Sequence, residues 1–276
     1  MHLCQPSQRN QALADIIVNR NSDMMYAGIV SGNNAGDVWV DSLTNPAFCA
    51  VWSNHLGGFH FMGSSYSHVS KSKLLTFVEN TVIPFLADKK ANYCEFSCDS
   101  QEWIPYIMDT LSKYKINRGK QYVYKLPNKN NVNREIPRPV NYNVFEINSD
   151  FVSKELLNLE NSEALYTDIE QTWERVEKFI KHGKGFVAIQ NNKVCSFAIT
   201  RFRYKDTYCI GVETFDPHKQ KGLSGYLSML LIKNIVNQGA DIWWDCMADN
   251  IASQKTAMKI GLTFDHEYEI FWFDIL

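Results

Sequence analysis

The order of apolar segments in the second half of the chain constrains its fold more than any other feature. Alternating apolar patterns predict strands, and Leu223, Leu227 and Leu231 recur at the spacing of one helix face. We predict helical structure over 151–182, strands over 186–189, 194–200 and 208–214, and a helix over 223–235. A strand over 242–246, a short helix over 250–261 and a strand over 268–273 follow. Strands interleaved with helices predict an α+β (α/β) domain with a mixed central sheet and flanking helices.

A polar stretch divides this half from the rest of the chain. Residues 125–140 read KLPNKNNVNREIPRPV and contain three prolines and four asparagines without apolar periodicity. Such a stretch cannot bury a face, so it is typical of a linker or a surface crossover. We therefore predict two domains, 1–138 and 139–276.

The first half repeats the same order more faintly. We predict strands over 38–40, 48–52 and 59–62, a helix over 74–86, a strand over 93–96, a helix over 103–111 and a strand over 122–126. Two interpretations stay open. The N-terminal domain is a degenerate copy of the C-terminal fold, or it is an unrelated accessory α/β domain.

Composition excludes several classes of protein. The formal net charge of −2 and a charged fraction of 21% give no basic stripe, so neither nucleic acid nor a membrane is an expected partner. We find no apolar run long enough for a transmembrane helix and no secretory signal at the N-terminus. The odd number of cysteines, 7, indicates reduced thiols and a cytoplasmic protein. No cysteine and histidine set has metal-ligand spacing, and His55 and His60 flank Gly57 and Gly58 as in a hairpin turn.

A glycine-bearing loop precedes the helix over 223–235. It reads Lys219-Gln220-Lys221-Gly222-Leu223-Ser224-Gly225. Backbone N–H groups in such a loop and at the helix start can bind an anion, although the same residues also suit a simple turn. The spacing is that of neither a P-loop nor a dinucleotide fingerprint.

A second motif follows the strand over 242–246. Asn250 stands where a helix N-cap is expected, and Ser253, Ala257 and Gly261 lie four residues apart on one face. Small side chains on one face allow either close approach of a ligand or tight packing of the helix on the sheet.

Together these residues resemble the GNAT superfamily of acyl-CoA-dependent N-acyltransferases. The family's phosphate loop, Gln/Arg-x-x-Gly-x-Gly/Ala, corresponds to 219–224, with Lys219 and Ser224 as departures. Its second motif corresponds to Asn250, Ser253 and the pair Gly261-Leu262. Segments including 38–41, 181–186 and 265–268 also resemble the two-domain branch that contains zwittermicin A resistance acetyltransferases.

The resemblance implies a C-terminal GNAT fold with acetyl-CoA as co-substrate and no metal. The pyrophosphate would lie on backbone N–H groups of the loop, and the pantetheine would pair with the strand that ends near residue 214. The implied cofactor-binding residues are Val212, Thr214, Lys219, Gln220, Lys221, Gly222, Leu223, Ser224, Gly225 and Asn250.

The catalytic residues are less clearly marked. Many family members carry a Tyr seven residues after the motif Asn as the acid for the thiol, and here that position is Ala257. Ser253 is the candidate replacement, acting through water. The family's base positions correspond to Tyr208 and Ile210, and Glu213 is the nearest carboxylate. We therefore predict Glu213, Ser253 and Tyr208 as catalytic candidates. Asp245 is a candidate wall of the amine pocket.

Two functions remain in view. The first is an acetyl-CoA-dependent N-acetyltransferase that acts on the amine of a small molecule by direct attack on the thioester. The second is a catalytically degenerate acyl-CoA-binding module or sensor, which Ala257 would suit. The sequence also leaves open a homodimer and, less favoured, an interaction protein without a ligand.

Overall fold

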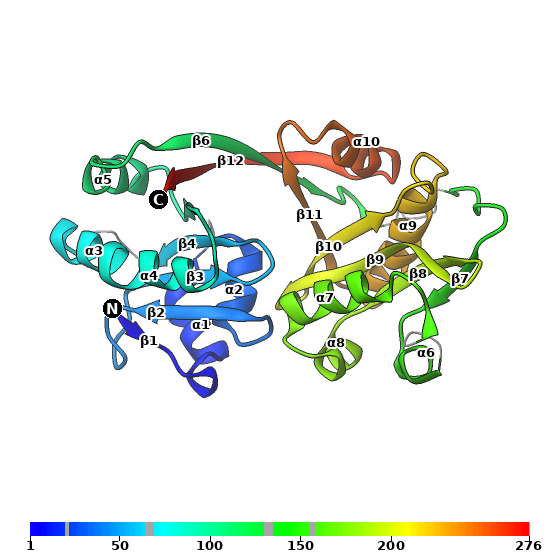
Figure 1. Ribbon diagram of the computed structural model, residues 1–276, viewed down its shortest axis with the longest axis horizontal. Helices are drawn as coiled ribbons and strands as arrows, with labels where there is room; N and C mark the ends of the chain where they lie inside the picture. Colours follow the sequence, from blue (N-terminus) through cyan, green and yellow to red (C-terminus); the bar gives the residue numbers. More distant parts are fainter. Residues whose placement is uncertain (20–21, 64–68, 130–134, 155–157, 276) are drawn as a thin grey trace. The chain divides into compact units, whose positions relative to one another are not determined.

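The computed structural model describes the chain except for residues 20–21, 64–68, 130–134, 155–157 and 276. The chain forms two compact units (Figure 1). Unit 1 consists of Met1–Lys120 and Tyr268–Leu276, and unit 2 of Gln121–Glu267. The units therefore divide between residues 120 and 121 rather than at the linker near residue 138, because the strand before the linker already belongs to unit 2.

Unit 2 is built on a mixed sheet. Its strands are β7 (Asn143–Glu146), β8 (Gly185–Gln190), β9 (Lys193–Tyr204), β10 (Thr207–Thr214) and β11 (Asp241–Met247). Neighbours from β7 to β10 pair antiparallel, and β10 and β11 pair parallel. The last part of β6 (Asn117–Lys125) pairs antiparallel with β11.

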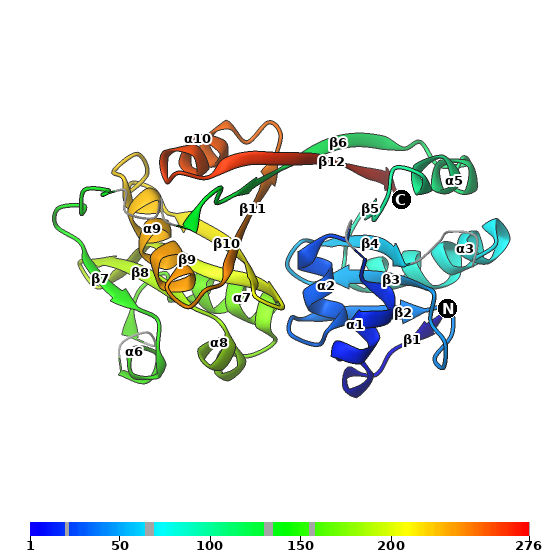
Figure 2. The same cartoon turned by 180° about the vertical axis from the view of Figure 1, so that it is seen from behind.

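Helices cover both faces of this sheet, as the two opposite views show (Figures 1 and 2). They are α6 (Ser149–Lys154), α7 (Ser162–Trp173), α8 (Val176–His182), α9 (Leu223–Val236) and α10 (Ile251–Lys259). On one face Leu223, Leu227 and Leu231 of α9 are buried in a core that also includes α10. On the other face α7 and α8 bury Trp173 and Phe179. Apolar residues one helical turn apart thus place α9 as the sequence predicts.

Unit 1 repeats the order of unit 2. Its strands are β1 (His2–Leu3), β2 (Gly36–Val40), β3 (Phe48–Ser53), β4 (Gly58–Gly63) and β5 (Tyr93–Cys98). Its helices are η1 (Pro6–Gln8), α1 (Gln11–Ile17), α2 (Met24–Val30), α3 (Lys71–Phe77), η3 (Val78–Val82), α4 (Ile83–Asp88) and α5 (Trp103–Thr110). The strands from β1 to β4 pair antiparallel, and β4 and β5 pair parallel.

In each unit, the strand that follows the parallel pair comes from the other half of the sequence. β6 follows the elements of unit 1, yet its residues 121–125 pair with β11 in unit 2. β12 (Thr263–Asp274) follows the elements of unit 2, yet its residues 271–274 pair with β5 in unit 1. Each unit thus depends on a strand that the other half supplies.

The predicted elements are present, with some subdivisions. The helical region over 151–182 is split into α6, α7 and α8, and Glu174, with φ 74°, separates the last two. The strand β7 and the helices α1 and α2 were not predicted, because their patterns are short. No helix in the described parts of the chain has the length and apolar character needed to cross a bilayer.

Candidate active site

The parallel strands of unit 2 separate towards their carboxyl ends. β10 and β11 pair only over Thr207–Cys209 and Asp241–Trp243. Near this point β9 carries a bulge, because Ile210 lies opposite Thr200 and Cys209 opposite Phe202, which leaves Arg201 as the extra residue. Beyond it, β10 continues to Thr214 and β11 to Met247 without a paired residue between them in these fully described strands. A cleft of about 810 Å³ opens there.

Most of the predicted site residues line this cleft. They are Val212, Glu213, Thr214, Lys219, Gln220, Gly222, Leu223, Ser224, Gly225, Asn250 and Ser253. Tyr208 and Lys221 do not line it. Tyr208 lies in the core beneath α9, at the paired end of β10, with the Arg203 guanidinium 5.2 Å from its ring centre. Burial raises the pKa of the Tyr208 hydroxyl.

The loop before α9 presents unobstructed backbone groups to the cleft. Gly222 is the N-cap of this 14-residue helix and has φ 81°, a left-handed conformation that favours glycine. A Cβ placed on Gly222 would meet no atom within 4 Å. Since the first N–H groups of a helix have no intrahelical partners and carry partial positive charge, this end of α9 suits an anion.

Charged side chains around the loop are held by neighbours. Lys219 Nζ lies 2.9 Å from Asp216 Oδ2, and this hydrogen bond raises the pKa of the lysine. His218 also lines the cleft, and its Nδ1 lies 2.9 Å from the Tyr142 hydroxyl. Burial, and secondly the charge of Lys221, lowers the pKa of His218. His218 is therefore part of the cleft wall as well as of the loop.

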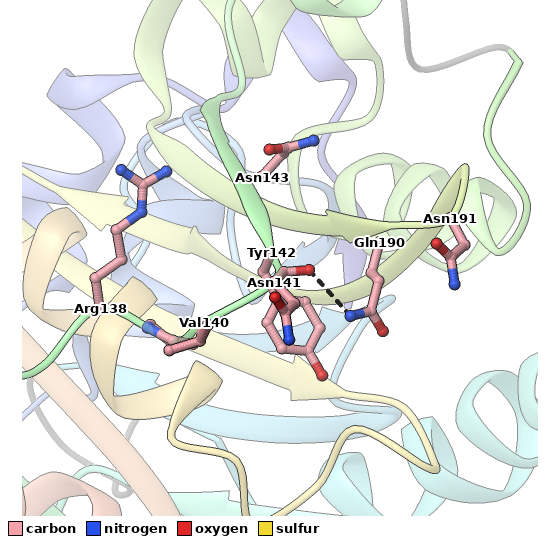
Figure 3. A pocket seen from close by; sticks show the side chains of 8 residues that line it. Arg138, Val140, Asn141, Tyr142, Asn143, Gln190 and Asn191 are labelled. Carbon is pink, nitrogen blue, oxygen red and sulfur yellow. Dashed lines mark hydrogen bonds between the residues drawn. The ribbon is translucent and has the colours of Figure 1, made fainter.

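A second hollow of about 610 Å³ has Tyr142 in its lining (Figure 3). Arg138–Asn143, Gln190 and Asn191 line it, and Gln190 Nε2 donates to the Asn141 carbonyl at 3.0 Å. Its polar groups are mainly amides, which neither donate nor accept protons near neutral pH. The chemistry therefore concentrates in the cleft between β10 and β11.

Strand register assigns the residues of the cleft to two faces. Residues directly opposite each other in an antiparallel pair share a face. Val212 lies opposite Ala198, which packs under α9, whereas Glu213 lies opposite Phe197, which packs under α7 and α8. On β11, Trp244 and Cys246 pack under α9. Since side chains alternate along a strand, Asp245 shares the α7–α8 face with Glu213.

The edge of β10 that faces the cleft keeps backbone groups available. The Phe215 N–H donates to the Cys195 carbonyl on β9 at 3.0 Å. N–H groups alternate in direction along an antiparallel strand, so those of Val212 and Thr214 point away from β9. An extended ligand lying along this edge could pair with them as a further strand would.

The helix α10 forms another wall. Asn250 Oδ1 accepts from the Ser253 N–H at 3.0 Å, which confirms Asn250 as the N-cap. Ser253 Oγ accepts from Trp244 Nε1 at 2.9 Å. Burial raises the pKa of the neighbouring Cys246 thiol, while the Ser253 hydroxyl acts in the opposite direction. Ala257, at the position where a Tyr is expected, is 0% exposed.

One ion pair in the cleft was not predicted. Arg201 lines the cleft, and its Nε and Nη2 contact the Asp168 carboxylate of α7 at 3.1 and 2.6 Å. A Cβ on Gly211 would come within 2.0 Å of Arg201 Nε, so this side chain crosses β10 where only glycine leaves room. A glycine inside a predicted strand is a signal for such a close approach.

The described residues contain no group of three or more His, Cys, Asp or Glu side chains arranged to hold a metal ion. His60 lies on β4 after a hairpin turn, as its sequence context predicts, and contacts Ser97 and Asp99.

The sequence matches a known protein family over most of its length. A family model described as GNAT acetyltransferase matches residues 14–271. No curated protein matches the sequence significantly.

Solved structures resemble the whole chain. A GCN5-related N-acetyltransferase-like protein from Streptococcus suis is 18% identical, with a TM-score of 0.66 over 98% of this chain and 100% of that one. A tandem GNAT protein from the clavulanic acid biosynthesis pathway is 8% identical, with a TM-score of 0.58 over 98% and 94%. A GCN5-related N-acetyltransferase from Sphaerobacter thermophilus is 12% identical, with a TM-score of 0.56 over 99% and 95%.

These likenesses confirm the predicted fold, a mixed sheet flanked by helices in the GNAT arrangement. The narrower resemblance to zwittermicin A resistance acetyltransferases stays a prediction.

Proposed function

Since this chain belongs to the GNAT acetyltransferase family, we propose that it transfers the acetyl group of acetyl-CoA to the amine of a small molecule. Acyl-CoA-dependent acetyl transfer is the activity that the family indicates. One observation supports the proposal most: the cleft joins an unobstructed helix start at Gly222 to the unpaired edge of β10. A long ligand with an anionic end and an amide-containing arm suits that combination.

In the proposed complex, the pyrophosphate lies on the backbone N–H groups from Gln220 to Gly225. The pantetheine runs along β10, where Val212 and Thr214 direct their N–H and C=O groups into the cleft. Asn250 lies beside this arm, and its Oδ1 is already used by the Ser253 N–H. Lys219 and Lys221 contribute positive charge near the pyrophosphate.

The proposed reaction is a direct attack. The amine nitrogen forms a bond to the thioester carbon, the carbonyl oxygen takes negative charge, and the C–S bond then breaks. The Val212 N–H is the proposed donor to that oxygen. Glu213, which lines the cleft, is the proposed acceptor of the proton that the ammonium must lose. Tyr208 has no part in this proposal, because it lies in the core.

The departing thiolate needs a proton. Ser253 lines the cleft and is held by Trp244 Nε1, so its hydroxyl is the proposed route, through water. The buried Ala257 supports the second candidate function, a module that binds acyl-CoA without transferring its acetyl group. Release of free thiol from acetyl-CoA in the presence of amines distinguishes the two. A cytoplasmic location and a homodimer stay predictions.

The experiment that tests the donor site compares two glycines. Gly222 and Gly239 lie at opposite ends of α9, both have φ 81°, and a Cβ on either would meet nothing within 4 Å. Gly222→Glu and Gly239→Glu therefore impose the same backbone strain and the same added charge. We expect Gly222→Glu to weaken acetyl-CoA binding by about 10- to 100-fold in calorimetry, because it places a carboxylate at the anion site. Equal affinities in the two variants would contradict the phosphate-loop assignment.

A further inference from the structure

One end of the cleft between β10 and β11 is closed, and the inference drawn from it rests on the proposed function. The two parallel strands pair for the last time at Cys209 and Trp243. The loop that precedes α9 lies beyond the other end of β10, after Thr214. A donor whose pyrophosphate lies on that loop, and whose pantetheine runs along β10, therefore directs its acyl group towards the closed end.

Strand register identifies the side chains that the acyl group meets there. Since the last pair joins residue 209 to residue 243, Ile210 and Trp244 are the first residues that stand across the gap from each other. Val212, the proposed donor to the thioester oxygen, lies two residues beyond Ile210 and shares its strand face. The acyl carbons beyond the thioester carbon thus extend towards the pair formed by Ile210 and Trp244.

These two side chains leave little room at the closed end. Ile210 and Trp244 line the cleft and also belong to the core beneath α9, where they are 4% and 2% exposed. Trp244 Nε1 donates to Ser253 Oγ on α10 at 2.9 Å. A buried ring held by its only polar group cannot turn aside without leaving that group unsatisfied. A longer acyl chain would have to displace packed side chains, which is unfavourable in a dense core.

We propose that Trp244, with Ile210 across the gap, limits the donor to short acyl groups, so that the cleft takes acetyl-CoA and excludes butyryl-CoA and longer homologues. The methyl end of the acetyl group lies against the indole ring. Trp244 acts on donor specificity and takes no part in bond making. The strand face covered by α7 and α8 is left for the acceptor.

The test measures the dissociation constants of acetyl-CoA and butyryl-CoA by calorimetry with the full-length protein, so that no acceptor is needed. We expect butyryl-CoA to bind at least about tenfold more weakly, because two extra methylenes do not fit a packed apolar pocket. In Trp244→Phe the ratio of the two constants should fall to about 1–3, because the smaller ring leaves space for those methylenes.

Trp243→Phe is the matched control. It makes the same change one residue earlier on β11, on the opposite strand face, and Trp243 is not among the residues that line the cleft. The Trp243 ring instead lies 5.1 Å from Lys125 Nζ. The ratio in this variant should equal that of the unchanged protein.

Ile210→Val widens the same end from the other strand by one methylene, so it should lower the ratio in the same direction by a smaller factor. It decides the question if Trp244→Phe binds neither donor. Equal affinities of the two donors in the unchanged protein would overturn the inference. So would a ratio that survives in both Trp244→Phe and Ile210→Val, or one that falls as far in Trp243→Phe. Failure of the unchanged protein to bind acetyl-CoA would instead overturn the proposed function itself.

Discussion

Units 1 and 2 share the order of their strands and the direction of each pairing but differ where the parallel strands end. In unit 2, β10 and β11 lose contact after Cys209 and Trp243, and the cleft opens. In unit 1, β4 and β5 stay paired to Phe61 and Cys98, and the Asp99 N–H then donates to the Phe61 carbonyl at 3.1 Å. The two parallel strands are therefore separated at their ends in unit 2 and still paired in unit 1.

Side chains satisfy in unit 1 what a ligand would satisfy in unit 2. Asp99 Oδ2 accepts from the Gly63 N–H, at the end of β4, at 3.1 Å. His60 Nε2 contacts the other oxygen of Asp99 at 3.0 Å, and His60 Nδ1 contacts Ser97 Oγ at 2.7 Å. Asn19 and Ser22 also donate to Asp99. A buried polar group with such partners has no need of a ligand.

The helices that follow β4 and β10 also differ in whether a side chain caps their first N–H groups. Ser70, the N-cap of α3, accepts with its hydroxyl from the Lys73 N–H at 3.3 Å. Gly222, the N-cap of α9, has no side chain to do this. Two local features therefore distinguish the units within one fold: the point where two parallel strands separate, and the residue that caps the next helix.

The largest expected effect concerns the exchanged strands. Fragments 1–138 and 139–276 each contain the strand that completes the other unit, so each would expose an unpaired sheet edge. We expect neither fragment to fold alone, and we expect the two to form a folded complex when they are produced together. Circular dichroism and size-exclusion chromatography measure both outcomes. If fragment 139–276 alone were folded and bound acetyl-CoA, β12 could replace β6 and the exchange would not be needed.

A smaller effect is expected when the hydrogen bonds that Asp99 accepts in unit 1 are removed. Asp99→Ala removes the acceptor for His60, Gly63 and two further donors, which should lower the free energy of unfolding by about 3–5 kcal/mol. Urea denaturation measures this change. Asp109→Ala is the control, because its partner Lys71 is exposed and pairs between exposed charges contribute little to stability. Acetyl-CoA affinity should stay unchanged in both variants. A large loss of affinity in Asp99→Ala alone would mean that unit 1 takes part in donor binding.

The smallest effect is a pH dependence in unit 1. Burial raises the pKa of the Asp23 carboxyl, although hydrogen bonds from the Met25 N–H and the Tyr268 side chain act in the opposite direction. A carboxyl with a higher pKa in the folded state binds more protons there. Its contribution to stability therefore falls as the pH rises from its ordinary pKa of 3.8 through the raised value. Asp23→Asn cannot ionise, and its Oδ1 can still accept from the Met25 N–H.

We therefore expect Asp23→Asn to be more stable than the unchanged protein near neutral pH, with the difference shrinking in acid. Urea denaturation between about pH 3 and pH 7 measures it. A stability difference that does not vary with pH would show that Asp23 keeps the same pKa in the folded and unfolded states.

Local patterns in the sequence predicted most helices and strands of both units. The spacing of Leu223, Leu227 and Leu231 identified α9, and Gly222 with Asn250 identified two walls of the cleft. The strand exchange was not predictable from the sequence. The alternating apolar pattern indicates that β6 and β12 are strands, but it does not indicate which neighbouring strand each one pairs with.

The contacts that shape the acceptor side were also beyond the sequence. Arg201 and Asp168 are 33 residues apart, and nothing local indicates that they meet. The bulge at Arg201 changes which side chains reach the cleft, since it shifts the register of β9 against β10. Tyr208 was chosen by its place in the family motif, yet it precedes the point where the strands part.

We propose that only the separated strands of unit 2 bind the donor. Calorimetric titration of the full-length protein with acetyl-CoA tests this proposal. We predict one site per chain, which Gly222→Glu weakens and Asp99→Ala leaves intact. Two sites per chain, no site, or one site with the same affinity in Gly222→Glu would contradict it.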